Sequence, residues 1–251
     1  PAAEQFPWQP KELVAVIGEH RRRHAGPIQQ VAYSGDGRWI ASISSSSGLL
    51  LIDAETLEEK LRPGPNASSG EGVLFTPDGK SLVATIRESV VLWDVSGTTP
   101  HERAKIPVNG FRLAITHDGQ KLAVLEHPGW IFSRWDLSGA APKEIGRRVQ
   151  AGGGGLIAMA PDGKTMASNS GVRLWDLTGE QPTEKAGITY TAPGAGGLVF
   201  SPDSKSLLTS AHDAVRIWDV TQKSPTERAS LPASIGDFGH GDNLKFSGDG
   251  S

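Results

Sequence analysis

A short motif recurs six times along the chain, and this repetition constrains the fold more than any other feature. Each copy joins an apolar triplet to a turn that contains an aspartate. The turn aspartates are Asp36, Asp78, Asp118, Asp162, Asp203 and Asp249, so successive copies start 42, 40, 44, 41 and 46 residues apart. A fixed period of about 40 residues is typical of repeat proteins in which each period forms one small structural unit.

Two further marks follow the turn in the same order in each of the middle copies. The first is an apolar residue followed by aspartate, found as Trp93-Asp94, Trp135-Asp136, Trp175-Asp176 and Trp218-Asp219, with Ile52-Asp53 in the first copy. The second is Pro-x-Glu, found at Pro100/Glu102, Pro142/Glu144, Pro182/Glu184 and Pro225/Glu227, and again at Pro10/Glu12. Three marks in constant order indicate a true repeat.

Each period predicts four short strands and no helix. In the fifth copy the strands are expected at residues 198–200, 206–210, 215–218 and 227–231. The Pro-Asp-Gly turns between them suit a tight reversal, because Pro presets φ, Asp bonds its own backbone and Gly accepts a positive φ. Short strands at regular spacing indicate an all-β array. A single small sheet cannot bury both faces, so we expect the sheets to stack, with the tryptophan of each third strand between neighbouring sheets.

These residues resemble the WD40-repeat family, and the resemblance covers about residues 11–250. It implies a β-propeller of four-stranded blades, in which the first strand lines a central channel and the fourth lies outside. The Pro-x-Glu variant is similar to WD-repeat arrays of bacterial proteins. The Gly-His that usually precedes the first strand is mostly missing, with His24 and His240 as candidates, so the buried hydrogen-bond network of the family is expected to be incomplete.

The repeats predict five complete blades and a partial sixth. The sixth copy supplies a first strand at residues 244–246, and residues 12–17 are candidates for its outer strand. Residues 1–10 are expected to form an N-terminal extension that either stands apart or joins the closing blade. Residues 11–251 are expected to form the propeller, either with an incomplete last blade or as a piece of a longer array.

The amino-acid composition excludes some kinds of binding site and argues against some kinds of partner. The chain has no cysteine, which excludes disulfides and thiolate metal sites. Its 25 Lys and Arg against 28 Asp and Glu give a net charge of -3, which argues against a nucleic-acid partner. No apolar run is long enough to span a membrane.

No motif predicts a catalytic, cofactor-binding or metal-ligating residue. The histidines lack the spacing of a zinc site, and there is no G-x-S-x-G segment. The glycines at 152–155 precede a strand rather than the helix that a phosphate-binding loop needs. We therefore expect no cofactor and no enzymatic activity.

The residues that differ between copies are the candidates for recognition. Arg21, Arg22 and Arg23 lie in a basic cluster expected on a loop between blades, and Arg147 and Arg148 fall in the equivalent region two blades later. Trp130 lies at a long hairpin tip, either as an interface anchor or folded against its own blade. The predicted partner-binding residues are Arg21, Arg22, Arg23, Arg87, Glu88, His127, Trp130, Arg147, Arg148, His212 and Asp213.

The sequence thus favours a non-catalytic scaffold that binds a protein or peptide through the loop face of a propeller. Two alternatives stay open. One is a propeller enzyme, such as a lactonase-like hydrolase or an oxidoreductase, with its site at the channel. The other is a purely architectural module of a larger bacterial protein. Fold alone does not decide among them, because function resides in the site.

Overall fold

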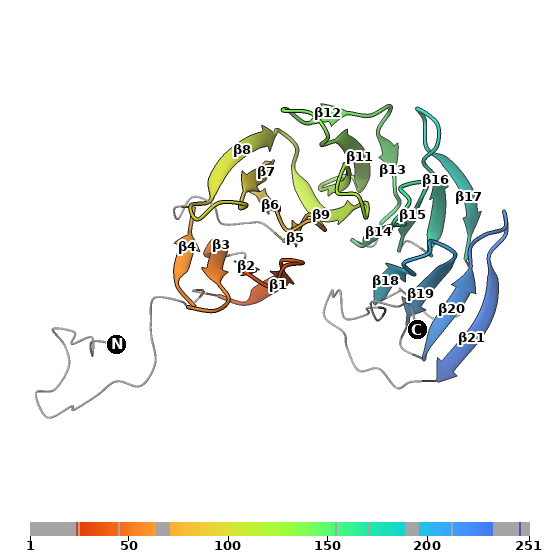
Figure 1. The fold of residues 1–251 in the computed structure, drawn as a ribbon. Helices are drawn as coiled ribbons and strands as arrows, with labels where there is room; N and C mark the ends of the chain where they lie inside the picture. The colour runs from red at the N-terminus through yellow and green to blue at the C-terminus, as the bar shows by residue number, and fades with distance from the viewer. Residues whose placement is uncertain are drawn as a thin grey trace, which may run out of the picture.

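Five antiparallel sheets follow one another along the chain in the computed structural model (Figure 1). The structure describes residues 24, 26–44, 46–63, 71–153, 155–169, 171–188, 196–211, 213–232 and 246. Within these residues every regular element is a strand. The predicted all-β propeller architecture is confirmed. The expected sixth blade and the extension at residues 1–10 lie outside the described residues, apart from Phe246.

Each sheet, called a blade below, takes its strands from one repeat in sequence order. Blade 1 contains β1 (Ile28–Tyr33), β2 (Trp39–Ser44), β3 (Gly48–Asp53) and β4 (Glu59–Leu61). Blade 2 contains β5 (Val73–Phe75), β6 (Ser81–Ile86), β7 (Ser89–Asp94) and β8 (His101–Ile106). Blade 3 contains β9 (Gly110–Ile115), β10 (Lys121–Glu126), β11 (Ile131–Asp136), β12 (Lys143–Glu144) and β13 (Val149–Gln150). Blade 4 contains β14 (Ile157–Met159), β15 (Thr165–Ser168), β16 (Arg173–Asp176) and β17 (Thr183–Gly187). Blade 5 contains β18 (Gly197–Phe200), β19 (Ser206–Ser210), β20 (Ala214–Asp219) and β21 (Thr226–Pro232).

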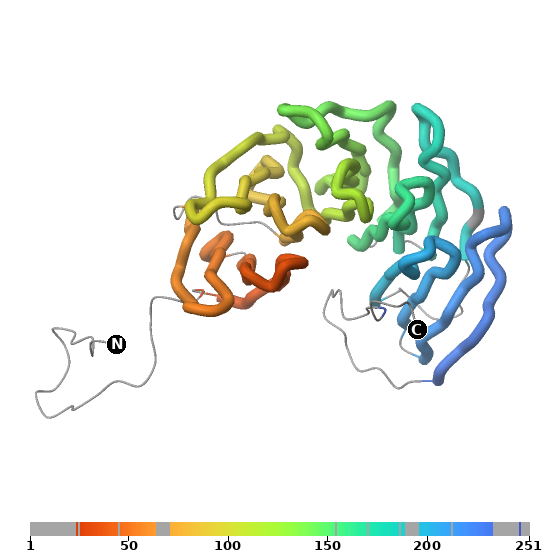
Figure 2. Tube along the Cα trace, viewed as in Figure 1, coloured from red at the N-terminus to blue at the C-terminus, as the bar shows by residue number. Residues whose placement is uncertain are grey.

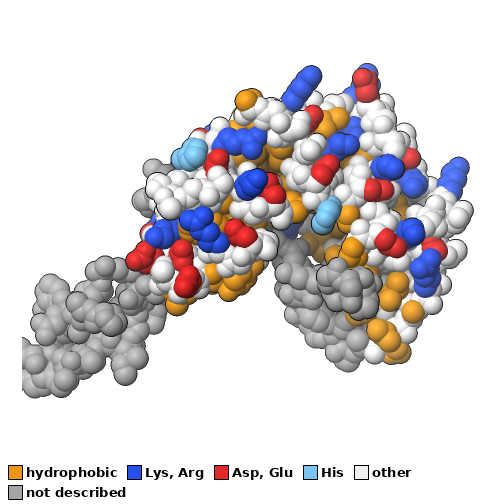
Figure 3. Space-filling view, viewed as in Figure 1, with side chains coloured by type: hydrophobic (Ala, Val, Ile, Leu, Met, Phe, Trp, Pro, Cys, Tyr) orange, Lys and Arg blue, Asp and Glu red, His pale blue; other side chains and the backbone are white. Residues whose placement is uncertain are grey.

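The blades are arranged in an arc around a common centre, with the first strand of each blade on the inside (Figure 2). Consecutive inner strands are neighbours in space. Exposed apolar side chains gather toward both ends of this arc (Figure 3). Ile28, Val31 and Tyr33 on β1 are exposed, as is Leu231 on β21. These positions belong to the two end blades, which have a described neighbour on one face only.

The tryptophan of each third strand packs against the preceding blade. Trp93 lies in a core with blade 1, Trp135 in a core with blade 2, and Trp175 in a core with blade 3. All three are at most 8% exposed. Trp218 of blade 5 packs on blade 4 but is only partly buried. The prediction that these rings lie between neighbouring sheets is confirmed.

The turn aspartates of blades 1, 2, 3 and 5 each close a turn with a neighbouring hydroxyl group, whereas blade 4 has Ala160 at the hydroxyl position. In blade 2 the Thr76 hydroxyl donates to Asp78 Oδ1 at 2.6 Å, and the same oxygen accepts the Lys80 N–H at 3.1 Å. Gly79 completes this turn at φ 70°, where an L side chain is strained. The aspartate after each tryptophan closes a turn in a similar way. Asp94 Oδ1, for example, accepts hydrogen bonds from both the N–H and the hydroxyl of Ser96.

We expect the repeated turns to make the protein acid-sensitive. Hydroxyl hydrogen bonds lower the pKa values of turn aspartates such as Asp78 and Asp118, and the hydroxyl of Thr221 with other hydrogen bonds lowers the pKa of Asp219 to about 2. A carboxylate with a depressed folded-state pKa stabilises the fold above its unfolded pKa, and this stabilisation is lost as pH falls through the folded pKa. The urea midpoint should therefore drop between about pH 4 and pH 2.

The variant Asp118→Asn should show a shallower acid loss than the wild type, since its turn no longer titrates. Glu88→Gln is the control, because Glu88 accepts no hydrogen bond from any residue in the described ranges. A urea midpoint that stays constant from pH 5 to pH 2.5 would contradict the assignment of these turns.

Arginines join consecutive blades through backbone carbonyls. Arg134 in β11 is buried, and its guanidinium donates to Leu177 O at 2.8 Å and Glu180 O at 2.6 Å in blade 4. Burial lowers the pKa of Arg134, but a guanidinium remains charged. Arg103 of blade 2 donates in the same way to Leu137 O in blade 3, at 3.0 Å. These bonds satisfy carbonyls just after the third strand of the next blade.

The outer strand of blade 3 departs from the expected single fourth strand. It is split into β12 and β13, which both pair with β11. Gly146 lies between them at φ 62°, and the N–H of Arg147 donates to Glu180 O of blade 4 at 3.1 Å. The chain leaves the sheet here to contact the next blade.

Candidate interaction site

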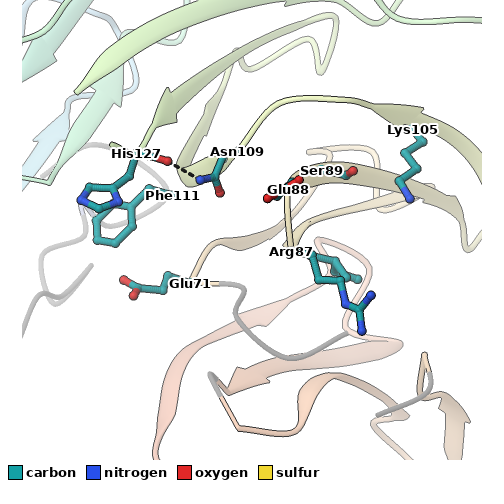
Figure 4. A pocket seen from close by; sticks show the side chains of 10 residues that line it. Glu71, Arg87, Glu88, Ser89, Lys105, Asn109, Phe111 and His127 are labelled. Carbon is teal, nitrogen blue, oxygen red and sulfur yellow. Dashed lines mark hydrogen bonds between the residues drawn. The ribbon is translucent and has the colours of Figure 1, made fainter. Parts of the chain in front are cut away.

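A cavity of about 840 Å³ opens where the hairpin tips of blades 2 and 3 meet the connection between these blades (Figure 4). The β6–β7 tip contributes Arg87 and Glu88, and the β10–β11 tip contributes His127. The polar lining consists of Glu71, Arg87, Glu88, Ser89, Lys105, Asn109 and His127. Phe111 adds an aromatic wall.

Buried groups fix the main chain of Glu71 just before β5. Its N–H donates to the hydroxyl of Thr85 at 2.9 Å, and Thr85 is fully buried. Its carbonyl accepts a hydrogen bond from Arg112 Nη1 at 2.7 Å. Because both main-chain groups are held, the carboxylate is presented at the cavity from a defined position.

The part of the wall that contains His127 is held by a reciprocal pair of hydrogen bonds between two loops. The N–H of His127 donates to the carbonyl of Asn109 at 3.0 Å, and Asn109 Nδ2 donates to the carbonyl of His127. The ring of His127 lies 5.9 Å from the ring of Phe111 and 5.0 Å from the ring of Trp130. Trp130 in turn meets Phe111 edge-on at 5.4 Å. The hairpin tip is therefore anchored to the start of β9.

Both tips contain a non-glycine residue with a positive φ. Arg87 has φ 54° and Trp130 has φ 51°. L residues rarely adopt this region, and such strain persists only where the surroundings hold it. Ile86 pairs with Ser89 across the β6–β7 tip, so Arg87 and Glu88 alone form its reversal and project outward.

The charged residues of this cavity form no ion pairs within the described part of the chain. Glu71, Arg87, Glu88 and Lys105 all lack a salt bridge there. Some charged side chains elsewhere are paired: Arg148 Nη1 lies 3.0 Å from Glu126 Oε2, and other pairs join Arg62 to Glu59, Arg216 to Asp213 and Arg228 to Asp219. Others, such as Glu55 and Lys80 at separate turns, form no ion pair within the described residues either, so the cavity is distinguished by having four such charges around one hollow. A group of unpaired charges of both signs around one hollow is what a polar partner would use.

Three of the predicted partner-binding residues line the cavity: Arg87, Glu88 and His127. Trp130 lies behind it, half-buried against its own blade, which is the second of the two expectations for this ring. Asp213 is far along the chain in blade 5, paired with Arg216 at 2.5 Å.

The expected placement of Arg147 and Arg148 is wrong. They lie between β12 and β13, inside the split outer strand, and not in the loop that leads to the next inner strand. Arg148 binds Glu144 and Glu126, so it ties the outer edge of the blade to the tip strand. Arg21, Arg22, Arg23 and His212 lie outside the described residues.

Sequence reasoning predicted none of Glu71, Lys105, Asn109 and Phe111 as partner-binding residues. Lys105 is the penultimate residue of the outer strand β8, and a lysine at such a position gives no signal in one sequence. Asn109 and Phe111 flank Gly110, where a Cβ atom would lie 2.7 Å from Val90 Cγ2. An Asn-Gly pair directly before an inner strand was the available clue.

The described residues hold no group of three or more His, Asp or Glu side chains that could bind a metal ion. No helix among them is long and apolar enough to cross a lipid bilayer. Positive and negative side chains are interspersed over the face drawn in Figure 3. The arrangement at the cavity suits hydrogen bonding and charge pairing.

Known proteins are similar to this chain in sequence and in fold. Actin-interacting protein 1 of Drosophila melanogaster, a WD40-repeat protein, is 26% identical over 216 residues, or 78% of this chain. The chain resembles WD40-repeat propellers. This chain spans 34% of the length of that relative, about a third. No family model matches the sequence.

A solved structure supports the architecture. Hydrazine synthase of Kuenenia stuttgartiensis superposes with a TM-score of 0.62, at 18% identity, over 86% of this chain and 70% of that chain. At this identity the likeness concerns the propeller fold alone.

Proposed function

We propose that this WD40-like propeller is a non-catalytic scaffold that binds a protein segment at the cavity between blades 2 and 3. The observation that carries the proposal is the set of unpaired charges, Glu71, Arg87, Glu88 and Lys105, around one cavity whose His127 wall is anchored. A preorganised wall reduces the conformational entropy lost on binding, so such a site is suited to recognition. The name of the Drosophila relative, which refers to an interaction with actin, points to the same class of function.

Peptide display against the immobilised protein tests this proposal. We expect enriched peptides to lose at least about fivefold in affinity toward the triple variant Arg87→Ala, Glu88→Ala, Lys105→Ala, measured by fluorescence anisotropy. These residues are exposed, so each change should alter stability by no more than about 0.5 kcal/mol.

A matched control carries the changes Glu55→Ala, Lys80→Ala and Lys164→Ala, at exposed turns between other strands. It should bind the enriched peptides as the wild type does. If both triple variants bind equally well, or if no peptide is enriched, the cavity is not the recognition site and an architectural role becomes the better explanation.

A further inference from the structure

The charges of the cavity are not mixed evenly but are separated toward its two ends. Figure 4 shows the Glu71 carboxylate at the end where the rings of Phe111 and His127 lie, and Arg87 and Lys105 toward the other end. The rings are neighbours, with centroids 5.9 Å apart. The cavity therefore has an acidic, aromatic end and a basic end.

The acidic, aromatic end is suited to a cation. Carboxylates and ring faces both attract ammonium and guanidinium groups, and the attraction grows where water is partly excluded. Glu71 is only half-exposed, unlike the three charged residues Arg87, Glu88 and Lys105, which are exposed.

One fixed cation already lies beside this end. Arg112 is buried, and its Cζ lies 5.1 Å from the Phe111 ring centroid. Its guanidinium donates to the main-chain carbonyl of Glu71, so the carboxylate of that residue keeps its capacity to accept hydrogen bonds. An incoming cation would thus meet the carboxylate and the ring of His127 rather than the covered face of Phe111.

The basic end is suited to a carboxylate. Arg87 and Lys105 have no acidic partner in the described ranges. Glu88 lies between the two ends in Figure 4, beside Asn109. Both carry side-chain oxygens that can accept N–H groups from the main chain of an extended peptide.

We propose that the cavity binds a protein segment of mixed charge, with a lysine or arginine side chain at the Glu71 end and an aspartate or glutamate side chain at the Arg87 and Lys105 end. This inference rests on the proposed function and gives the partner its chemistry. The charge separation makes a segment with both signs a better ligand than a segment with either sign alone.

Four fluorescent peptides with a common Gly-Ser framework test the inference by anisotropy. The first kind carries both Arg and Glu and is made as a series in which two to five residues separate them. The second carries Arg alone, the third carries Glu alone, and the fourth carries neither charge. At low ionic strength the mixed peptide should bind the wild type tightest, with each charge contributing about two- to fivefold. Added salt should weaken this preference.

Two protein variants assign each charge to its end. In Glu71→Gln the peptide's Arg should no longer increase the affinity, while its Glu should still do so. In the double variant Arg87→Gln, Lys105→Gln the peptide's Glu should no longer increase the affinity, while its Arg should still do so. Circular dichroism confirms that each variant is folded. Equal affinity of the wild type for all four peptides, or equal effects of both variants on both charges, overturns the inference. If display-selected peptides still bind at the cavity, the proposed function survives that result.

Discussion

Trp175→Ala is expected to destabilise the protein by about 3–5 kcal/mol, the range for removing a large buried aromatic side chain. The ring of Trp175 is 5% exposed and meets the ring of Phe132 in the preceding blade at 5.4 Å. Its Nε1–H donates to Ser168 Oγ at 3.1 Å, and that hydroxyl donates to the carbonyl of Ala151. The substitution therefore opens a cavity between two blades and breaks a buried chain of hydrogen bonds. Urea unfolding at pH 7 measures the loss.

Trp218→Ala is the matched comparison, since the two residues occupy the same position in neighbouring repeats. Trp218 also donates to a hydroxyl, Thr209 Oγ1 at 2.9 Å, but it is only partly buried. Its removal should cost about 1–3 kcal/mol, less than the loss at Trp175. Equal losses at both positions, or a loss near zero at Trp175, would mean that burial between blades does not set the contribution of these rings.

The architecture could be predicted from sequence because the repeated residues all have local structural reasons. Asp78 and Asp94 close turns with hydroxyl groups two residues away, and the tryptophan before Asp94 fills the gap between sheets. A constraint that recurs six times becomes visible as a period. The strand order within each blade followed from the same marks.

The site was less predictable because it depends on contacts between different repeats. Arg87 and Glu88 were recognisable as a hairpin tip, but Lys105 reaches the same cavity from an outer strand. The split of the outer strand of blade 3 moved Arg148 away from the loop face, and Gly146, a glycine inside an expected strand, was the residue that could have marked the split. Side-chain packing decided the place of Trp130, which turns onto Phe111 rather than outward.

Gly146→Ala should destabilise the protein by about 2–5 kcal/mol. Gly146 has φ 62°, which costs an L residue about 1–2 kcal/mol. A Cβ atom there would also lie 1.8 Å from the Glu180 carbonyl oxygen and 2.7 Å from Arg134 Nη2. The backbone must then shift, which weakens the Arg134 hydrogen bonds that join blades 3 and 4, and such overpacking costs about 1–3 kcal/mol more. Thermal and urea unfolding of the variant measure the total.

Gly171→Ala separates strain in the backbone from contact between blades. Gly171 has φ 69°, close to that of Gly146, yet a Cβ atom there would meet nothing within 4 Å. This variant should lose only about 1–2 kcal/mol of stability, because only the strained backbone conformation destabilises it. The difference between the two variants then reports how closely the edge of blade 3 approaches blade 4. Losses of the same size would show that the blades are free to separate at Glu180, and that the Arg134 contacts do not hold them at this distance.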